Sequence, residues 1–255
     1  MSVVPSIVGR KGPAVVLLTV MLLVVAAVIA ARWGMANAIA ADALAAKVEW
    51  QDSFLQSGVL PTVSERNAVY AELSAARGMD PRNPELMEQS GALLLTPVAV
   101  AEAELSVGSS AAQSVQQQAI DAFSAAVVAR PVSAYAWVNL ALSKYQAGQV
   151  DKVLYQSLEN AARLGPWEPE VQLAVTDLGF ALWDEMPPTL QPAVIQMATN
   201  AQQRYADKVF GIAERRGRLA VVCSLSAGAQ KGVENKLENT AGQLAKSRCQ
   251  RSLAS

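Results

Sequence analysis

The sequence predicts an all-α protein whose first helix crosses a membrane. Hydrophobic residues make up 52% of the 255 positions and aromatic residues only 5%. The abundant Ala and Leu have high helix propensities. Signals that start and end helices alternate along the chain, and no stretch shows the alternating, β-branched pattern of a strand. A long run without charge also lies near the N-terminus.

Residues 13–31 form the core of the predicted transmembrane helix. They carry no charged side chain, and about 20 apolar residues cross the hydrocarbon core of a bilayer. Arg10 and Lys11 precede the run, whereas Arg32 and Trp33 close it. Basic residues are enriched on the cytoplasmic side of membranes. We therefore expect a single-pass membrane protein with a cytoplasmic N-terminus and most of the chain beyond the membrane, which in a bacterium is the periplasm.

A cleaved signal peptide is the alternative interpretation of this run. Ala38 and Ala40 offer an A-x-A cleavage site. The apolar run is longer than the usual signal-peptide core of about 7–15 residues, which favours an uncleaved helix. Both interpretations place the remainder of the chain beyond the membrane.

The composition excludes several kinds of active site and partner. The chain has no His, which excludes Ser-His-Asp and Cys-His catalysis and His-containing zinc sites. The net charge of −1 and the pI near 5.6 disfavour a nucleic-acid partner. Asp184 and Glu185 form an acidic pair that glycoside chemistry could use, but adjacent helical residues do not face each other across a cleft. We expect no catalytic, cofactor-binding or metal-binding residues, and no cofactor.

Two cysteines, Cys223 and Cys249, stand 26 positions apart. Two candidate helices lie between them, so the thiols would meet if these helices fold back on each other. A disulfide would then require an oxidising compartment. Two buried free thiols are the alternative.

Local signals divide the rest of the chain into helices. We expect a helical stalk at 35–55, a helix that Ser64 caps and Gly78 ends, and another that begins near Pro84 and breaks at Thr96. Further helices are expected at 111–129, 132–146, 151–164, 168–184, 189–206, 206–214, 218–226 and 233–248. The basic cluster at 214–218 is interpreted as a solvated helix end, and contact with acidic polysaccharide or lipid headgroups is the alternative.

The segment around residues 119–140 has the pattern of a helical repeat. Tetratricopeptide (TPR) repeats are helix pairs of about 34 residues that carry W-x₂-L-G-x₂-Y, A-x₃-F and P. The matching residues are Ala119, Phe123, Ala126, Pro131, Trp137 and Leu140. The chain departs from the pattern at Ala141, which replaces the glycine, and at Lys144, which replaces the tyrosine. We expect about three degenerate TPR-like pairs, an insertion around 96–110, and capping helices after the pairs.

These intervals have a packing interpretation. Small Ala side chains let helices approach closely, Phe123 and Trp137 fill the gaps, and Pro131 and Pro166 end helices. Trp167 follows Pro166 in a proline-rich turn and is interpreted as a wedge between helix pairs. Its alternative role is a platform that stacks on a sugar.

Residues 130–184 resemble a family of small membrane-anchored, TPR-like proteins encoded with bacterial exopolysaccharide biosynthesis genes, the VpsP type. The most similar pieces are RPVSAYAW at 130–137 and ENAARLGPWEPEVQ at 159–172. The N-terminal helix and the overall length agree with this resemblance. It implies a role near polysaccharide synthesis or export in the inner membrane, and it supplies no catalytic residues.

One stripe on the helix that begins near Trp137 is the expected partner-binding groove, because TPR domains bind partners through their first helices. Its residues are Tyr135, Val138, Leu142, Tyr145 and Gln146. Tyr and Leu side chains suit a peptide or a helix. Packing of this stripe against neighbouring segments is the alternative.

The predicted organisation has five parts. These are a cytoplasmic N-terminus (1–12), a transmembrane helix (13–33), a helical stalk (34–60), a TPR-like domain (61–184) and capping helices (185–255). The predicted function is that of a non-enzymatic scaffold or adaptor in exopolysaccharide biosynthesis or export, with the membrane and polysaccharide synthesis or export proteins as partners. A periplasmic assembly chaperone for another envelope complex and a polysaccharide-modifying enzyme are the alternatives.

Overall fold

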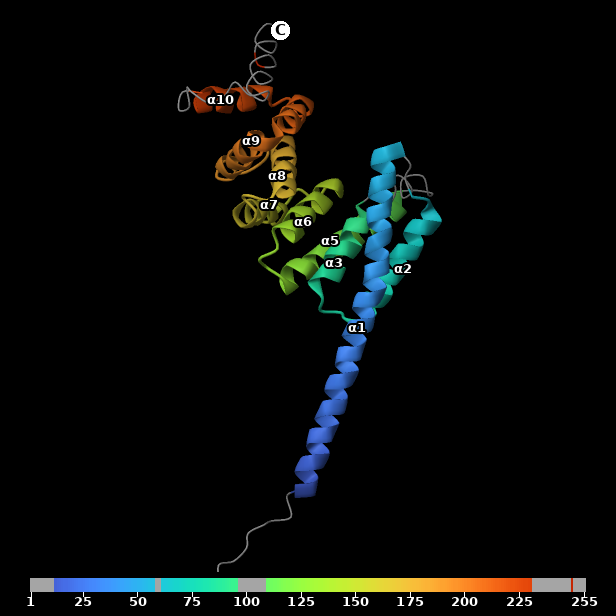
Figure 1. Ribbon diagram of the computed structural model, residues 1–255. Helices are drawn as coiled ribbons and strands as arrows, with labels where there is room; N and C mark the ends of the chain where they lie inside the picture. The colour runs from blue at the N-terminus through green and yellow to red at the C-terminus, as the bar shows by residue number, and fades with distance from the viewer. Residues whose placement is uncertain (1–11, 58–60, 96–108, 231–248, 250–255) are drawn as a thin grey trace, which may run out of the picture. The chain divides into compact units, whose positions relative to one another are not determined.

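The computed structural model describes residues 12–57, 61–95, 109–230 and 249, and these residues form helices and turns without a strand (Figure 1). The helices are α1 (Gly12–Ser57), α2 (Val63–Met79), α3 (Pro84–Leu94), α5 (Ser109–Ala129), α6 (Ala134–Gln146), α7 (Lys152–Leu164), α8 (Pro169–Ala181), α9 (Gln191–Arg215) and α10 (Leu219–Gln230). The all-α prediction is confirmed.

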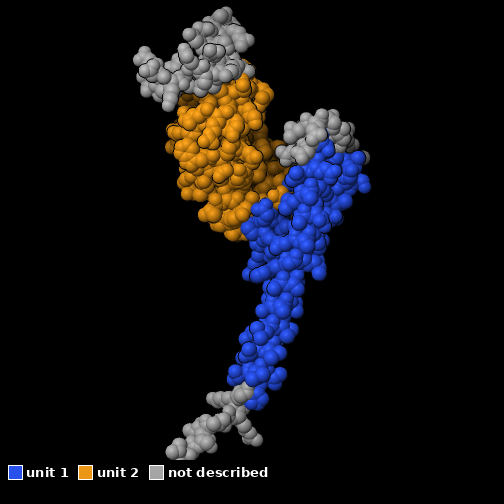
Figure 2. Space-filling view, in the orientation of Figure 1, with its two compact units in different colours: residues 1–86 blue, residues 87–255 orange. Residues whose placement is uncertain are grey.

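The chain forms two compact units, Met1–Leu86 and Met87–Ser255 (Figure 2). The two units are defined by packing alone. The expected functional boundaries, at residues 12, 33, 60 and 184, stay predictions. The expected helix at 233–248 lies outside the described residues, as does most of the expected insertion at 96–110.

Helix α1 is continuous, so the predicted transmembrane run and the predicted stalk form one element. The large apolar side chains of residues 15–29 are 42–70% exposed. The helix is therefore apolar and long enough to cross a membrane. Farther along, Ala36, Ala40 and Ala43 are buried where α1 packs on α2. Small side chains at this spacing allow two helices to approach closely.

Helix α2 begins and ends differently from the sequence prediction. Its N-cap is Thr62, not Ser64, and Thr62 and Glu65 form a reciprocal capping box. The Thr62 hydroxyl accepts the Glu65 N–H, while the Glu65 carboxylate accepts the Thr62 N–H at 2.7 Å. Gly78 does not end the helix, which continues to Met79 with Asp80 as C-cap. The capping residue thus stands three positions before the glutamate, as the capping box requires.

In the second unit each helix packs against the next, and short turns join α5 to α6 and α6 to α7. Neighbouring helices joined in this way are antiparallel. Phe123 of α5 and Leu140 of α6 lie in one buried cluster, and the residues that α6 to α10 bury form the larger core. These contacts confirm the packing roles expected for Ala119, Phe123, Ala126 and Leu140, all of which are buried.

The long helix α9 contains the break that the sequence predicts. Tyr205 has non-helical angles (φ −129°, ψ 40°) inside Gln191–Arg215, where separate helices were expected to meet at Ala206. One residue outside the helical region bends the path of α9 at this point.

Candidate functional site

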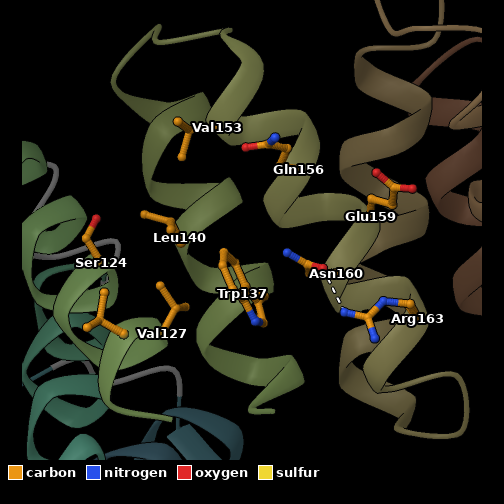
Figure 3. Close-up of a pocket in the computed structure, with 10 residues that line it drawn as sticks. Ser124, Val127, Trp137, Leu140, Val153, Gln156, Glu159, Asn160 and Arg163 are labelled. Atoms are coloured by element: carbon orange, nitrogen blue, oxygen red, sulfur yellow. Dashed lines mark hydrogen bonds between the residues drawn. The ribbon is translucent and has the colours of Figure 1, made fainter. Parts of the chain in front are cut away.

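A groove with a volume of about 600 Å³ lies across α5, α6 and α7 (Figure 3). Its apolar side chains are Val127, Val128, Trp137, Leu140 and Val153. Its polar side chains are Ser124, Gln156, Glu159, Asn160 and Arg163. An apolar surface with a few polar groups beside it is the usual composition of a binding site.

Helix α6 supplies two side chains in the middle of the groove, Trp137 and Leu140, one turn apart. Ser133 caps this helix by accepting the Ala136 N–H at 3.2 Å. The Trp137 indole N–H donates to the Pro131 carbonyl at 2.8 Å. This bond satisfies the one polar atom of the indole and fixes the ring, so that its apolar surface is available to the groove.

Helix α7 supplies the polar side. Gln156, Asn160 and Arg163 lie three or four positions apart and therefore share one helix face (Figure 3). The Arg163 guanidinium donates to the Asn160 side-chain oxygen at 2.9 Å. Glu159 adds an exposed carboxylate on the same side. The groove therefore presents amide groups and one charge of each sign next to its apolar surface.

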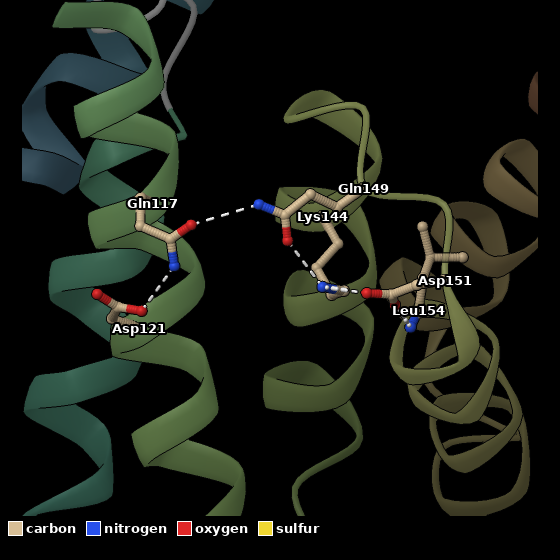
Figure 4. Close-up of polar contacts among 6 residues, drawn as sticks. All are labelled: Gln117, Asp121, Lys144, Gln149, Asp151 and Leu154. Carbon is tan, nitrogen blue, oxygen red and sulfur yellow. Dashed lines mark hydrogen bonds and ion pairs between the residues drawn. The ribbon is translucent and has the colours of Figure 1, made fainter. Parts of the chain in front are cut away.

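A polar network beside the groove fixes the three helices that form it (Figure 4). Lys144 of α6 is only 6% exposed. Its ammonium lies 2.9 Å from a carboxylate oxygen of Asp151 and donates to the Gln149 side chain at 2.8 Å. Asp151 also caps α7 by accepting the Leu154 N–H at 3.0 Å. Gln149 in turn donates to Gln117 of α5 at 3.3 Å. We call these contacts the Lys144 network.

The Lys144 network also changes the acidity of Asp151. Burial of this carboxyl raises its pKa, but the hydrogen bonds from Lys144 and from the Leu154 N–H, together with the charge of Lys144, outweigh that effect. The pKa of Asp151 is therefore below its ordinary value. The carboxylate stays ionised at neutral pH, as the buried ammonium requires.

The groove predicted from the sequence lies on a different face of α6. Val138 is 4% exposed and belongs to the core, so we correct its assignment to a partner-binding groove. Tyr135 and Tyr145 are half-buried and pack against the same core. The side chain of Leu142 is half-buried and that of Gln146 is exposed. Helical geometry directs this stripe away from Trp137 and Leu140.

Contacts of the two tyrosines are consistent with the packing alternative. The Tyr135 hydroxyl donates to the Glu168 carboxylate at 3.2 Å. Burial, followed by the nearby charges of Glu170 and Glu168, raises the pKa of Tyr135. Arg216 lies near Tyr145, which adds to the raised pKa of this guanidinium after the larger effect of Asp177. Both tyrosines thus face other groups of the same unit.

Trp167 does not have the role that the sequence prediction gave it. Its side chain is 73% exposed, so it does not act as a wedge between helix pairs. The preceding residue makes the connection instead: the Pro166 carbonyl accepts from Gln172 at 2.7 Å and from Asn200 at 3.0 Å. The spacing of side chains in a sequence does not reveal a backbone carbonyl that accepts hydrogen bonds from two helices. The expected helix-ending role of Pro131 and Pro166 is confirmed, since α5 ends at Ala129 and α7 at Leu164.

The basic cluster at 214–218 also needs correction, because it contains ion pairs with α8 and the turn that follows it. Arg216 donates to both carboxylate oxygens of Asp177, at 3.0 and 2.8 Å. The hydrogen bond with Asp177 is the largest cause of a raised Arg216 pKa. Arg218 pairs with Asp184. These contacts hold the turn between α9 and α10 against the helical domain.

Cys223 of α10 and Cys249 are joined by a disulfide, with their Cα atoms 5.7 Å apart. The structure therefore has the first of the two arrangements that the sequence allowed. The bond ties Cys249 to α10.

The sequence prediction missed the groove across α5–α7 for an identifiable reason. The repeat pattern gives Trp137 and Leu140 packing roles alone, and Leu140 is indeed buried. The pattern does not address the exposed side of α7. A usable signal was the row of Gln156, Asn160 and Arg163 beside a helix that carries Trp137, because polar residues at this spacing share one face.

No family model matches the chain, and no curated protein matches it. Within the described part of the chain, no group of three or more His, Cys, Asp or Glu side chains is arranged to hold a metal ion. The groove, the long apolar helix and the disulfide are therefore the features of this protein that bear on its function.

Proposed function

We propose that this protein is a membrane-anchored, non-enzymatic scaffold or adaptor that serves bacterial exopolysaccharide biosynthesis or export. It binds a segment of a partner protein in the groove across α5–α7. The groove is the observation that carries the proposal: fixed helices present Trp137 and exposed valines beside amide and charged groups. The resemblance of residues 130–184 to VpsP-type proteins supports the biological setting and the TPR-like character of the helices.

The structure of α1 supports its role as an uncleaved anchor. Cleavage after Ala40 would remove Ala36 and Ala40, whose side chains are buried on α2. Because α2 needs these side chains to stay covered, the packing favours an uncleaved helix over a cleaved signal peptide. None of the residues in the most apolar stretch of α1 is buried by the rest of the protein, which supports contact with lipid.

The disulfide between Cys223 and Cys249 supports a periplasmic location of the helical domain. Disulfides persist in the bacterial periplasm and are rare in the cytosol. The greater number of basic residues before the apolar run supports the same orientation.

The groove suits a peptide segment as its occupant. Val128 is 81% exposed at its edge, and an apolar partner side chain would cover it and the Trp137 ring. Asn160 and Gln156 provide donors and acceptors for a peptide backbone, while Arg163 and Glu159 select charged neighbours. A groove that combines apolar, amide and charged side chains discriminates among partners by charge and shape.

Cross-linking in cells followed by affinity purification of the full-length protein tests this proposal. The groove variant is Val128→Lys, which adds a charge at an exposed site near the C-terminus of α5, where Lys is tolerated. Val132→Lys is the matched control, since Val132 is 74% exposed and does not line the groove. We expect polysaccharide polymerase or export proteins with the wild type and the control, and their loss with Val128→Lys.

Other outcomes would overturn the proposal in different ways. Recovery of an unrelated envelope complex would favour the assembly chaperone. Recovery of carbohydrate without protein would make the domain a glycan-binding module. Turnover of a glycan by the purified protein would require an enzymatic function.

A further inference from the structure

The end of α2 is fixed beside one particular residue of α1. Arg32 of α1 donates to the carbonyl oxygens of Gly78, at 3.2 Å, and of Met79, at 3.5 Å. These carbonyls belong to the last turn of α2, where acceptors have no partner within the helix and the helix dipole is negative. Arg32 therefore satisfies and neutralises the C-terminal end of α2.

The position of Arg32 along α1 determines how deep in the membrane its contact with the end of α2 lies. Residues 13–31 carry no charge and rise about 28 Å as a helix, which matches the ~30 Å hydrocarbon core. Arg32 is the first charged residue beyond this run, and the exposed Trp33 follows it. Trp residues concentrate at the membrane interface. Given the proposed anchor, both residues lie where hydrocarbon meets headgroups, and the last turn of α2 lies there with them.

The packing of α1 on α2 holds the last turn of α2 beside Arg32. Ala36, Ala40 and Ala43 of α1 are buried, and so are Val69, Leu73 and Ala76 of α2. Both helices belong to the same compact unit, and α2 packs along the part of α1 that follows the apolar run (Figure 1). The turn after α2 therefore cannot leave the membrane surface without separating these two buried stripes.

The turn at residues 80–83 carries the groups that would meet the lipid. Pro81 and Arg82 are exposed, and Arg77 is half-buried in the preceding helical turn. Asp80, the C-cap of α2, is the one acidic residue of the turn. A guanidinium binds phosphate through two parallel hydrogen bonds and is the preferred side chain for this contact. Three arginines, Arg32, Arg77 and Arg82, stand here against Asp80 and against Glu85 in the first turn of α3, so basic side chains are in excess.

We propose that the turn at residues 80–83 rests in the lipid headgroup layer, with Arg82 bound to lipid phosphate. The turn would then be a second point of contact with the membrane besides α1. This inference depends on the proposed anchoring role of α1. It assigns to the first unit a membrane-facing surface that is distinct from the α5–α7 groove.

Site-directed spin labelling of the full-length protein tests the inference in vesicles of phosphatidylethanolamine and phosphatidylglycerol. The native cysteines are joined in a disulfide, so a label reacts with one introduced thiol. Pro81→Cys reports on the turn and leaves Arg82 intact. Ala68→Cys, exposed on α2 and about 15 Å from its C-terminal end, is the aqueous control. Leu22→Cys reports on the anchor.

We expect the Leu22→Cys label to be shielded from a water-soluble nickel chelate, the Pro81→Cys label to lie at phosphate depth, and the Ala68→Cys label to be fully accessible. Adding Arg82→Glu should move the Pro81→Cys label toward water, and excess inorganic phosphate should not. A Pro81→Cys label as accessible as that at Ala68→Cys would overturn the inference while α1 remains an anchor. Full accessibility at Leu22→Cys would overturn the anchor as well.

Discussion

The ammonium of Lys144 lies 2.9 Å from a carboxylate oxygen of Asp151, and the same carboxylate caps α7 through the Leu154 N–H. One side chain thus neutralises a buried charge of α6 and starts the helix that forms the polar side of the groove. The relationship gives Lys144 a structural role in the contact between α6 and α7. It also makes Asp151 the residue whose replacement should disturb the groove most directly.

Asp151→Asn should lower the free energy of unfolding by about 1–2 kcal/mol. Asn retains the N-cap, so the loss comes from leaving the Lys144 charge without its partner. The half-exposed carboxylate is screened by water, which limits the effect. Asp151→Ala should cost about 1 kcal/mol more because the cap is also lost. Chemical unfolding followed by circular dichroism measures both changes.

A matched control is available in Asp121→Asn. Asp121 accepts a hydrogen bond from Gln117 at the edge of the same network and is exposed. Its replacement should change stability by less than about 0.5 kcal/mol. Equal losses for Asp151→Asn and Asp121→Asn would show that the Lys144–Asp151 pair has no special role.

The same carboxylate should make stability depend on pH. Because the folded-state pKa of Asp151 is lowered, its contribution is complete above the unfolded pKa of about 3.9 and is lost as pH falls through the folded value. Glu65 has a lowered pKa as well, through its hydrogen bonds with Thr62. The measurement is therefore the difference between wild type and Asp151→Asn. We expect this difference to shrink below about pH 4; a constant difference would contradict the assignment.

The contact between α8 and α9 leaves no room for a side chain at Gly179. A Cβ there would lie 2.5 Å from a methyl group of the buried Val194. Gly179→Ala should therefore destabilise the protein by about 1–3 kcal/mol through overpacking. Gly211 of α9 is the control, because a Cβ there meets only the end of the Arg215 side chain at 3.6 Å. Gly211→Ala should stabilise by about 0.5–1 kcal/mol, and thermal melting distinguishes the two.

The corrected position of Trp167 has its own consequence. Since this side chain is 73% exposed, Trp167→Ala should change stability by less than about 0.5 kcal/mol. Phe123→Ala, in the buried cluster of α5 and α6, should cost about 3–5 kcal/mol. A large loss on replacing Trp167 would restore the wedge interpretation.

Changing both Cys223 and Cys249 to Ser should lower stability by about 3 kcal/mol, the chain-entropy estimate for a loop of this length. The redox state in cells also tests the orientation. If the domain is periplasmic, the thiols resist alkylation until a reductant is added. Free thiols in freshly lysed cells would place the domain in the cytosol.

Sequence patterns were sufficient to predict the helices and most of the core residues. The motif at residues 119–140 identified Phe123 and Leu140 as packing residues because helix spacing determines which side chains face inward. The break near Ala206 was also visible in the sequence.

The candidate site depends on contacts that spacing does not record. Val138 and Trp137 are adjacent in sequence, yet one lies in the core and the other lines the groove. Which face of α6 is open depends on where α8 packs, and that contact joins segments far apart in the chain. The ion pairs of Arg216 and Arg218 were missed for the same reason.

A role of the α5–α7 groove in polysaccharide assembly can be measured through the amount of polysaccharide secreted by cells whose only copy of this protein is Val128→Lys or Val132→Lys. Both variants change an exposed valine to lysine, and their levels in the membrane fraction should be equal. Secretion should fall with Val128→Lys, in the groove, and should be normal with Val132→Lys. Normal secretion from both, or equal loss from both, would contradict a role for the α5–α7 groove in polysaccharide assembly.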